Sequence, residues 1–312
     1  MENKNGSRIL VTGGAGYIGS AFVIRAAAAG IKINVLDTRN PYRENQNSLM
    51  TNSQINYFEG DIAEDSIVEQ SLSGVDLVIH LAAVSDGKAG KAFPELTKEI
   101  NVTALKQFVA LSKKNGVPGF VFVSTMGVYG NKYHVPLTEN LAVDPADPYS
   151  ESKAMGEEIV RKENSDSFAT ISLRLAMVYG VSPFMKTDLI VNRLVFDAVT
   201  KKEITVWGGN QRRPQVHVDD VGDLFFHLHS HDLKELASEN FNVVGTNPSI
   251  LEIAMIIQQK LHDVKVIVLP GRSHEDSFEM DGTKLKRALN FTPQISLDTG
   301  IEELINYYSA NS

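Results

Sequence analysis

Short apolar runs, rich in β-branched residues, alternate with amphipathic segments along the first half of the chain. The apolar runs predict strands at 8–13, 32–37, 55–61, 75–83, 119–125 and 169–176. The segments between them predict helices near 17–29, 64–72, 95–115 and 149–164. Strands that are apolar along their whole length and separated by helices indicate a parallel sheet covered on both faces. We therefore expect a doubly wound α/β fold.

The pattern changes after Gly180, where the segments become shorter. They predict, in chain order, a helix near 188–200, a strand at 204–207, a helix from about 219, and small strands and helices within 240–312. We expect residues 1–180 to form a domain around a parallel Rossmann sheet. Residues 181–312 are expected to form mainly a smaller α/β domain that binds substrate, with the segment at about 215–245 able to rejoin the first domain.

A glycine-rich segment, VTGGAGYIGS, follows the first predicted strand and opens the first predicted helix. Gly13, Gly16 and Gly19 allow a tight turn, a close approach of pyrophosphate to the backbone, and close packing of helix on strand. The unpaired N–H groups of the helix N-terminus then attract phosphate. A purely structural glycine turn is the alternative, but the strand–turn–helix context favours dinucleotide binding. Tyr17 and Ile18, between the last two glycines, are expected at the same site.

The choice of dinucleotide depends on Asp37, which ends the second predicted strand 18 residues after Gly19. A carboxylate at this place accepts hydrogen bonds from the ribose hydroxyls and repels a 2′-phosphate, which favours NAD over NADP. Arg39 weakens this argument, because a nearby arginine accommodates that phosphate. We expect NAD as the cofactor.

Further cofactor contacts are expected at the ends of the next two strands. Asp61, followed by Ile62, is placed to meet the adenine edge, although a helix N-cap is an equally simple role for it. Ala82 and Ala83 are small enough to let a cofactor lie close to the backbone. His80 is expected to be a core residue rather than a catalyst.

A candidate catalytic group comes from one helix and one strand end. Tyr149 and Lys153 are four residues apart on a predicted helix and therefore share a face. A neighbouring ammonium favours the phenolate and lowers the pKa of a tyrosine, which suits it to general acid–base chemistry near neutral pH. Thr125 or Ser124, at the carboxyl end of the fifth strand, can hydrogen-bond the same substrate oxygen. That edge of a doubly wound sheet is where ligands bind.

Composition narrows the possible partners. The chain of 312 residues has no cysteine and a formal net charge of −8. It therefore lacks disulfides and thiolate sites, and nothing in its charge favours nucleic acid or a membrane surface. No apolar run approaches the roughly 18 residues of a membrane span, and no signal-peptide core is present at the start. We therefore expect a cytoplasmic protein. We expect no metal site, because the histidines of HLHSH at 227–231 have no carboxylate at the spacing of a catalytic metal site.

Taken together, these motifs resemble the extended short-chain dehydrogenase/reductase family, in its nucleotide-sugar epimerase and dehydratase branch. The likeness covers essentially the whole chain and rests on TGGAGYIG, GDI, HLAA, INVTAL, VSTMGVYG, YSESKAMGE, LRLAMVYG, RRPQVHVDDV and the C-terminal GRSHEDSFEMDGTKLKRALNFTP. It implies tightly bound NAD, transient oxidation of a sugar hydroxyl to a ketone, and a homodimer. Thr125, Tyr149 and Lys153 fall on the family's catalytic positions.

The resemblance also suggests residues for the substrate. Arg213 and Arg272 match arginines that hold the nucleotide diphosphate, a task that suits a planar guanidinium. Asn101 is expected at the cofactor, and Asn192 and Met126 at the substrate. His217 and Asp220 are expected to position the loop and helix around them.

Two departures from the family pattern decide between activities. Sugar-nucleotide 4,6-dehydratases have an Asp-Glu pair after the catalytic threonine, whereas this chain has Met126 and Gly127, which cannot move protons. Met177 stands where many 4-epimerases have an asparagine. The first departure argues against loss of water, so we expect an NAD-dependent nucleotide-sugar epimerase acting at C4, whereas the second departure leaves the sugar open and supports the alternative below. A reductase of nucleotide-linked ketosugars is the alternative, and a non-catalytic NAD-binding protein is a remote third.

Overall fold

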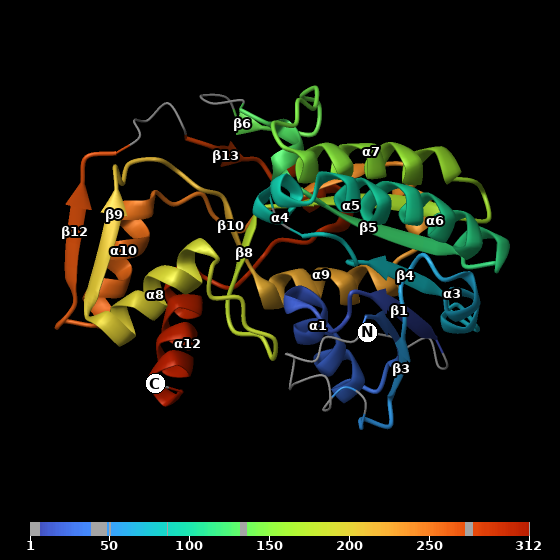
Figure 1. Ribbon diagram of the computed structural model, residues 1–312, viewed down its shortest axis with the longest axis horizontal. Coiled ribbons are helices and arrows are strands. Elements are labelled where there is room, and N and C mark those ends of the chain that lie inside the picture. The colour runs from blue at the N-terminus through green and yellow to red at the C-terminus, as the bar shows by residue number, and fades with distance from the viewer. Residues whose placement is uncertain are drawn as a thin grey trace.

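The computed structural model describes residues 7–38, 49, 51–85, 87–131, 136–271 and 277–311. A seven-stranded sheet forms the larger part of the molecule (Figure 1). Its strands, in spatial order, are β11 (Asn240–Val243), β7 (Ala169–Leu175), β5 (Gly119–Thr125), β4 (Leu77–His80), β1 (Arg8–Thr12), β2 (Lys32–Asp37) and β3 (Ile55–Glu59). Every neighbouring pair is parallel. The predicted doubly wound parallel sheet is confirmed.

Helices cover both faces of this sheet, as its apolar strands require. One face packs on α1 (Tyr17–Ala28) and α9 (Val218–Ser230), where the rings of Phe22 and Phe225 meet edge to face. The other face packs on α3 (Asp65–Ser71), α6 (Leu105–Lys114) and α7 (Pro148–Glu163). Ile9 and Leu10, neighbours on β1, belong to opposite layers because side chains alternate along a strand.

The strand order reverses direction between β1 and β4. At such a switch point the loops leaving the carboxyl ends of the two strands diverge, and ligands bind in the crevice between them. The fold therefore places the glycine loop after β1 and the segment after β4 on either side of one opening.

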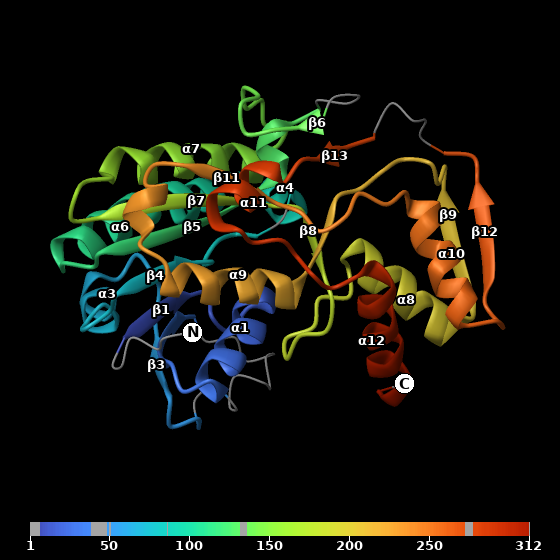
Figure 2. The same cartoon turned by 180° about the vertical axis from the view of Figure 1, so that it is seen from behind.

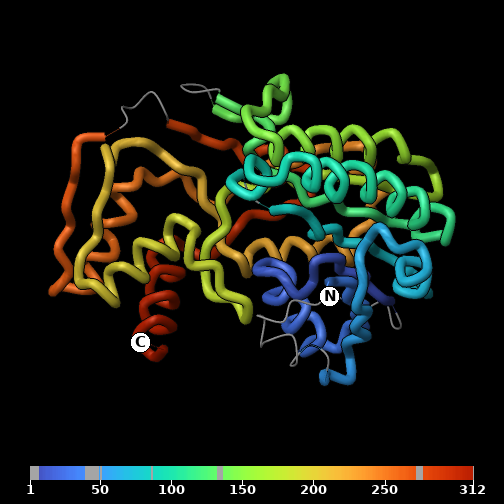
Figure 3. Tube along the Cα trace, viewed as in Figure 1, coloured from blue at the N-terminus to red at the C-terminus, as the bar shows by residue number. Residues whose placement is uncertain are grey.

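A smaller part of the molecule lies to one side of the sheet (Figure 2). It has its own apolar core. It is built from α8 (Ile190–Lys201), β9 (Glu203–Trp207), α10 (Ile250–Lys260), β12 (Lys265–Leu269) and α12 (Leu297–Ala310). Strands β9 and β12 pair in parallel, and the helices pack on one side of them. The chain passes back and forth between the two parts, as the tube in Figure 3 shows.

Several later segments lie with the larger part. Strand β11 joins the edge of the main sheet beside β7, and α11 (Thr283–Leu289) packs on β11. Two small strand pairs join distant parts of the chain. Strand β8 (Met177–Tyr179) pairs with β10 (Gln215–His217), and β6 (Pro136–Leu137) pairs with β13 (Glu279–Met280). The short helical turn η3 (Leu233–Leu236) contacts β7.

The helix predicted at 95–115 has three consecutive pieces. These are α5 (Pro94–Lys98), the π-helical turn η1 (Glu99–Ala104) and α6. The widened turn includes Asn101, whose side chain is buried. The segment at 84–93 includes a short helix, α4 (Gly87–Ala92), that packs on α7.

Candidate active site

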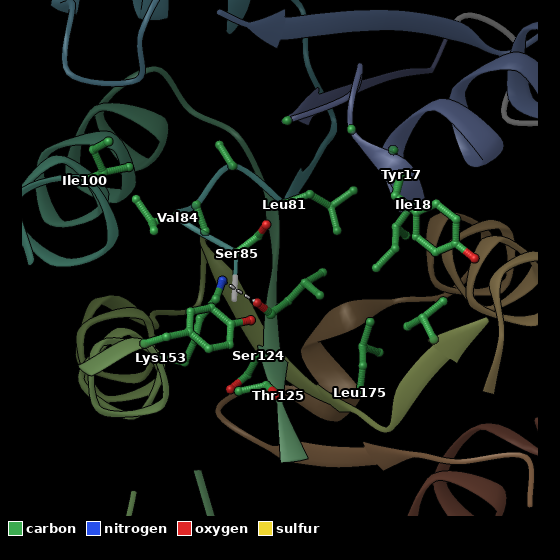
Figure 4. A pocket seen from close by; sticks show the side chains of 18 of the residues that line it. Tyr17, Ile18, Leu81, Val84, Ser85, Ile100, Ser124, Thr125, Lys153 and Leu175 are labelled. Atoms are coloured by element: carbon green, nitrogen blue, oxygen red, sulfur yellow. Dashed lines mark hydrogen bonds between the residues drawn. The ribbon is translucent and has the colours of Figure 1, made fainter. Parts of the chain in front are cut away.

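A cavity of about 570 Å³ opens at the carboxyl ends of the central strands. It brings together fourteen of the residues predicted from the sequence: Gly13, Gly16, Tyr17, Ile18, Gly19, Asp37, Asp61, Ile62, Ala82, Ala83, Ser124, Thr125, Tyr149 and Lys153. Figure 4 shows Tyr17 and Ile18 on one side of this cavity and Lys153, Ser124 and Thr125 on another. The glycine loop and the proposed catalytic group therefore share one site.

The three glycines of the loop are required for different reasons. Gly13 has a φ of +69°, and a Cβ there would lie 2.7 Å from the Ala82 nitrogen. At Gly19 a Cβ would lie 2.5 Å from the Gly13 oxygen, so α1 could not pack on the loop. These two glycines are dictated by the fold itself.

Gly16 differs from its neighbours, because a Cβ built there meets only the Gly13 oxygen, at 3.1 Å. It is the N-cap residue of α1, and no side chain caps that helix. The open space at Gly16 and the uncapped N–H groups beside it are what a bound pyrophosphate needs. The loop therefore fits the predicted dinucleotide on grounds of space and of hydrogen-bond donors.

The two acidic residues of the cavity are tied to the backbone around it. Asp37 accepts a hydrogen bond of 2.8 Å from the Ala15 N–H, so its carboxylate lies against the glycine loop. Asp61 accepts a hydrogen bond of 2.9 Å from the Ala63 N–H. The N-cap of α3 is Glu64, which leaves Asp61 outside that helix and on the cavity wall.

The helix that carries Tyr149 begins with strong local signals. Asp147 caps α7 by accepting a hydrogen bond of 3.0 Å from the Ser150 N–H, and Pro148 occupies the first turn. Helix α4 lies so close that a Cβ at Gly90 would be 2.9 Å from the Tyr149 Cβ. Tyr149 is thus fixed in the first turn of α7, in the wall of the cavity.

Lys153 lies one turn further along α7 and is 4% exposed. Its Nζ donates a hydrogen bond of 2.8 Å to the Val123 carbonyl and lies 4.8 Å from the centre of the Phe122 ring. Loss of hydration on burial lowers the pKa of Lys153 to about 8, and the Glu157 carboxylate opposes that decrease. A buried ammonium at this place can change its protonation state within the physiological range.

The two adjacent hydroxyls make different hydrogen bonds. Ser124 Oγ donates to Glu157 Oε1 at 2.6 Å, whereas Thr125 Oγ1 accepts from the Gly127 N–H at 3.2 Å. A hydroxyl has one proton to donate. The Ser124 proton is therefore committed to Glu157, and the Thr125 proton is directed to neither of these partners.

Asn101 and Asn192 were predicted as ligand contacts but do not line this cavity. The Asn101 amide hydrogen-bonds both backbone groups of Val84, at 2.8 and 3.1 Å, and the Ser152 hydroxyl. The Asn192 amide accepts from the Gly180 N–H and donates to the Tyr17 hydroxyl. Both amides are buried, and their hydrogen bonds hold wall segments in place.

Met126 lines a second cavity, of about 270 Å³, rather than the first. Thr125, Leu175, Ala176 and Met177 border both cavities, so the two spaces adjoin at the proposed catalytic hydroxyl. A Cβ at Gly127 would lie 2.5 Å from Ser150 Oγ, so any side chain at this position requires Ser150 to turn away.

The two predicted arginines have different outcomes. The Arg213 guanidinium lies 5.3 Å from the centre of the Phe278 ring, and its Nη1 donates to the Arg212 carbonyl at 2.8 Å. Phe278 borders the second cavity, so Arg213 stands behind its wall. Arg272, like Arg39, lies outside the described residues.

Three histidine and acid predictions agree with the structure. His80 is buried, shares a hydrogen bond of 2.9 Å with Thr12, and has its pKa lowered to about 3 by burial, so it is a neutral core residue. His217 accepts from the Asp219 N–H at the start of α9, and Asp220 accepts from the Gln294 and Ile295 N–H groups. Both hold loops, as expected.

Other wall residues carried no recognisable local signal. Ser85 comes from the segment before α4, Gly87 is the first residue of α4, and Lys186 and Leu189 come from the segment before α8. Lys186 brings a positive charge to the cavity from the smaller part of the molecule. Among the described residues no helix is long and apolar enough to cross a membrane, and no cluster of metal-ligating side chains occurs in those same ranges.

A family model, the NAD dependent epimerase/dehydratase family, matches residues 9–244. The chain belongs to this family. Family membership agrees with the glycine loop and with the Tyr-Lys pair in one cavity, and it establishes NAD as the cofactor of the chemistry.

Named relatives in this family carry out more than one reaction. The chain is 29% identical to a UDP-glucose 4-epimerase of Lactobacillus helveticus, over 92% of each chain. It is 27% identical to a dTDP-glucose 4,6-dehydratase of Escherichia coli, over 97% of this chain and 94% of the relative. Among solved structures, the UDP-glucuronic acid 4-epimerase of Bacillus cereus, in complex with UDP-glucuronic acid and NAD, matches with a TM-score of 0.85 at 25% identity, over 98% of this chain and 100% of the other.

Proposed function

We propose that this protein is a nucleotide-sugar epimerase that inverts C4 through a transient 4-ketosugar. The observation that supports this most strongly is that Tyr149, Lys153 and Thr125 line the same cavity as the glycine loop. A sugar hydroxyl placed at Tyr149 and Thr125 would therefore have its carbon facing the cofactor. Proximity of this kind converts hydride transfer into an intramolecular step.

Each step of this reaction uses groups of the cavity. NAD held at the glycine loop would supply the hydride acceptor for C4 and, in its reduced form, the hydride donor. Tyr149, as phenolate, takes the proton of the 4-hydroxyl while the hydride leaves C4, and this forms the ketone. Thr125 donates a hydrogen bond to the ketone oxygen, which can only accept. Tyr149 gives its proton back when hydride returns to the opposite face of C4.

Lys153 sets the proton affinity of Tyr149 in this scheme. Its ammonium, one turn along the same helix, favours the phenolate over the neutral phenol. Because Lys153 is buried, this charge acts through a medium that screens it much less than water does.

The second cavity provides the space for the ketosugar to turn. It adjoins the first at Thr125, and its wall includes Met126, Leu175, Ala176, Met177 and Phe278. A mainly apolar wall of this kind makes few strong hydrogen bonds to a sugar ring. The ketosugar could therefore rotate between the two hydride transfers. Met126 and Gly127 also provide neither the acid nor the base that loss of water would need.

We also propose the organisation around this site. Residues 1–180 would form the NAD-binding domain and residues 181–312 mainly the substrate domain, with about 215–245 rejoining the first. Phe93, Leu96 and Met155, on or beside α5 and α7, are 60%, 46% and 41% exposed, and such an apolar surface supports a homodimer. Sedimentation would test the dimer. The absence of cysteine fits the cytoplasm, which fractionation of cells would test.

The amount of cofactor that stays bound tests the proposed function against its alternative. An epimerase regenerates NAD in each turnover, so the purified protein should retain NAD through gel filtration and need none added. A ketosugar reductase uses the same catalytic group but must exchange its cofactor. Oxidation of added NADPH that depends on a nucleotide-linked ketosugar, with no epimer formed, would refute the epimerase.

A further inference from the structure

A buried ion pair lies behind the proposed catalytic hydroxyls. Glu157 of α7 and Arg174 of β7 meet through two hydrogen bonds, of 2.9 Å from Arg174 Nε to Oε1 and 2.7 Å from Nη2 to Oε2. Their side chains are 6% and 4% exposed. The proposed mechanism uses neither residue. Glu157 nevertheless hydrogen-bonds Ser124, on the strand β5 that also carries Thr125, and Arg174 is the partner of Glu157.

Ser124 is the third member of this group. Its hydroxyl donates to Glu157 Oε1 at 2.6 Å, so both carboxylate oxygens of Glu157 have strong partners. Thr125, the next residue, keeps its proton for a substrate oxygen because it uses its own oxygen to accept from Gly127. The two adjacent hydroxyls therefore have different roles. The Ser124 hydroxyl anchors the strand end to Glu157, and the Thr125 hydroxyl can donate to a substrate oxygen.

Helix α7 holds the end of β5 at two neighbouring residues. Tyr149, Lys153 and Glu157 follow one another at intervals of four and share a face of the helix. Lys153 donates to the Val123 carbonyl, and Glu157 accepts from the Ser124 hydroxyl. The distance between Tyr149 on the helix and Thr125 on the strand is therefore fixed by these two bonds.

The network continues toward the second cavity. Arg174 Nη1 donates to the Tyr129 hydroxyl at 3.0 Å, and that hydroxyl donates to Asn242 Oδ1 at 2.7 Å. The Asn242 amide then donates to the carbonyls of Leu137 and Asp281, at the ends of the small strands β6 and β13. The Glu157–Arg174 ion pair that anchors Ser124 is therefore also connected, through Tyr129 and Asn242, to the segments around β6 and β13.

Stability alone does not explain such a group. A buried ion pair loses its hydration, and apolar residues of similar volume often serve the fold as well or better. We propose that Glu157 is a positioning residue of the reaction, which sets Thr125 against Tyr149 through Ser124 and supplies the negative charge that keeps Lys153 an ammonium. This inference rests on the proposed function.

The charges around Lys153 support the second part of this role. It faces Tyr149 and Glu157 from its own helix, His80 from β4 and, beyond Glu157, Arg174 from β7. His80 is neutral, because burial lowers its pKa to about 3. Glu157 is the carboxylate whose charge raises the pKa of Lys153 against the effect of burial.

Two substitutions of Glu157 separate charge from position. Glu157→Gln keeps the shape and removes the charge, so Lys153 should lose its proton at lower pH. Glu157→Asp keeps the charge but is too short to reach both Ser124 and Arg174. The measurement is single-turnover formation of bound NADH, followed by absorbance after a nucleotide sugar is added, across pH.

Glu157→Gln should move the alkaline limb of the rate profile to lower pH, whereas Glu157→Asp should lower the rate about tenfold or more and leave that limb in place. Glu158→Gln is the matched control, because Glu158 lies next in the helix, pairs with Arg161 on the surface and should leave both unchanged. Circular dichroism and retained NAD report folding. If Glu157→Gln folds and its rate falls at the same alkaline pH as the wild-type rate, the charge of Glu157 does not keep Lys153 protonated, and this part of the proposal is overturned.

Ser124→Ala keeps the test decisive where Glu157→Gln does not fold, since it leaves the ion pair intact. It should lower the rate about tenfold with an unchanged alkaline limb, and Thr125→Val should lower the rate further. Full activity in Ser124→Ala overturns the anchoring role. If the wild-type protein forms no NADH with any nucleotide sugar, the proposed function fails instead, so the two failures are distinguishable.

Discussion

Lys153 and Val123 are joined by a hydrogen bond of 2.8 Å from the ammonium to the backbone carbonyl. This bond holds a buried charge at the end of the strand that carries Thr125. It also keeps Lys153 one helical turn from Tyr149, where in the proposed mechanism its charge would favour the phenolate. The geometry of these residues leads to predictions about activity, pH and stability.

Tyr149→Phe should abolish turnover and leave NAD bound. The substitution removes only the hydroxyl that would exchange the substrate proton, and it leaves untouched the glycine loop proposed to face the pyrophosphate. Assays of epimer formation and of cofactor released on denaturation check the two parts. Turnover above about one hundredth of the wild-type rate would contradict the role of Tyr149 as base.

The pH dependence follows from the burial of Lys153. Burial lowers its pKa to about 8, so the ammonium is lost as pH rises through that value and activity should fall on the alkaline side. The pH profile of single-turnover hydride transfer measures this. A rate that stays constant well above pH 8 would show that the charge of Lys153 is not needed.

The same burial predicts a stability effect of opposite sign. The unfolded chain binds the Lys153 proton more tightly than the folded protein, so the buried ammonium costs stability below about pH 8, and the cost disappears as pH rises toward 10.5. Lys153→Met should therefore be inactive yet more stable near neutral pH, by about 1–3 kcal/mol. Thermal melts at pH 7 compare the two proteins, and a less stable Met variant would contradict this.

The glycine loop allows folding and cofactor binding to be separated. Gly16→Ala should fold with little loss of stability but lose NAD affinity, because a Cβ there meets only the Gly13 oxygen, at 3.1 Å, and otherwise enters the space beside α1. Gly13→Ala should destabilise the protein by about 1–3 kcal/mol, since its φ is positive and the Cβ meets Ala82. Denaturant unfolding and calorimetric titration with NAD measure both. Equal effects of the two changes would argue against the assigned roles.

The space beside Met126 is limited by Ser150. Gly127→Ala should cost about 0.5–1.5 kcal/mol, because Ser150 must turn away and lose its hydrogen bond of 2.8 Å to Asp147. Adding Ser150→Gly should remove most of the additional cost of the alanine. A double-mutant cycle from thermal melts measures this coupling, and strictly additive effects would mean that the two residues do not conflict.

The sequence predicts best the features that depend on local spacing. The strand, the glycine turn and the helix of the cofactor loop are consecutive, and Tyr149 and Lys153 are one turn apart, so the pattern alone brings them together. Parallel strands then place Thr125 and Ala82 at the same edge. These residues all line one cavity.

The hydrogen bonds of the cavity wall and the buried ion pair could not be predicted from the sequence, because they join segments that are distant in the chain. Asn101 and Asn192 have polar side chains near the site, but their partners at Val84 and Gly180 become neighbours only in the folded chain. The ion pair did leave one trace, because Arg174 is the one charged residue of the strand predicted at 169–176. A charge inside a buried strand requires a partner, and Glu157, four residues after Lys153, is that partner.

The most direct test of the central claim follows the hydrogen at C4. A nucleotide sugar carrying deuterium at C4 should be converted to its C4 epimer with the deuterium still at C4, because the same hydride leaves and returns. Nuclear magnetic resonance of the product distinguishes the outcomes. Deuterium lost to solvent, or a product that has lost water, would contradict epimerisation through a 4-ketosugar.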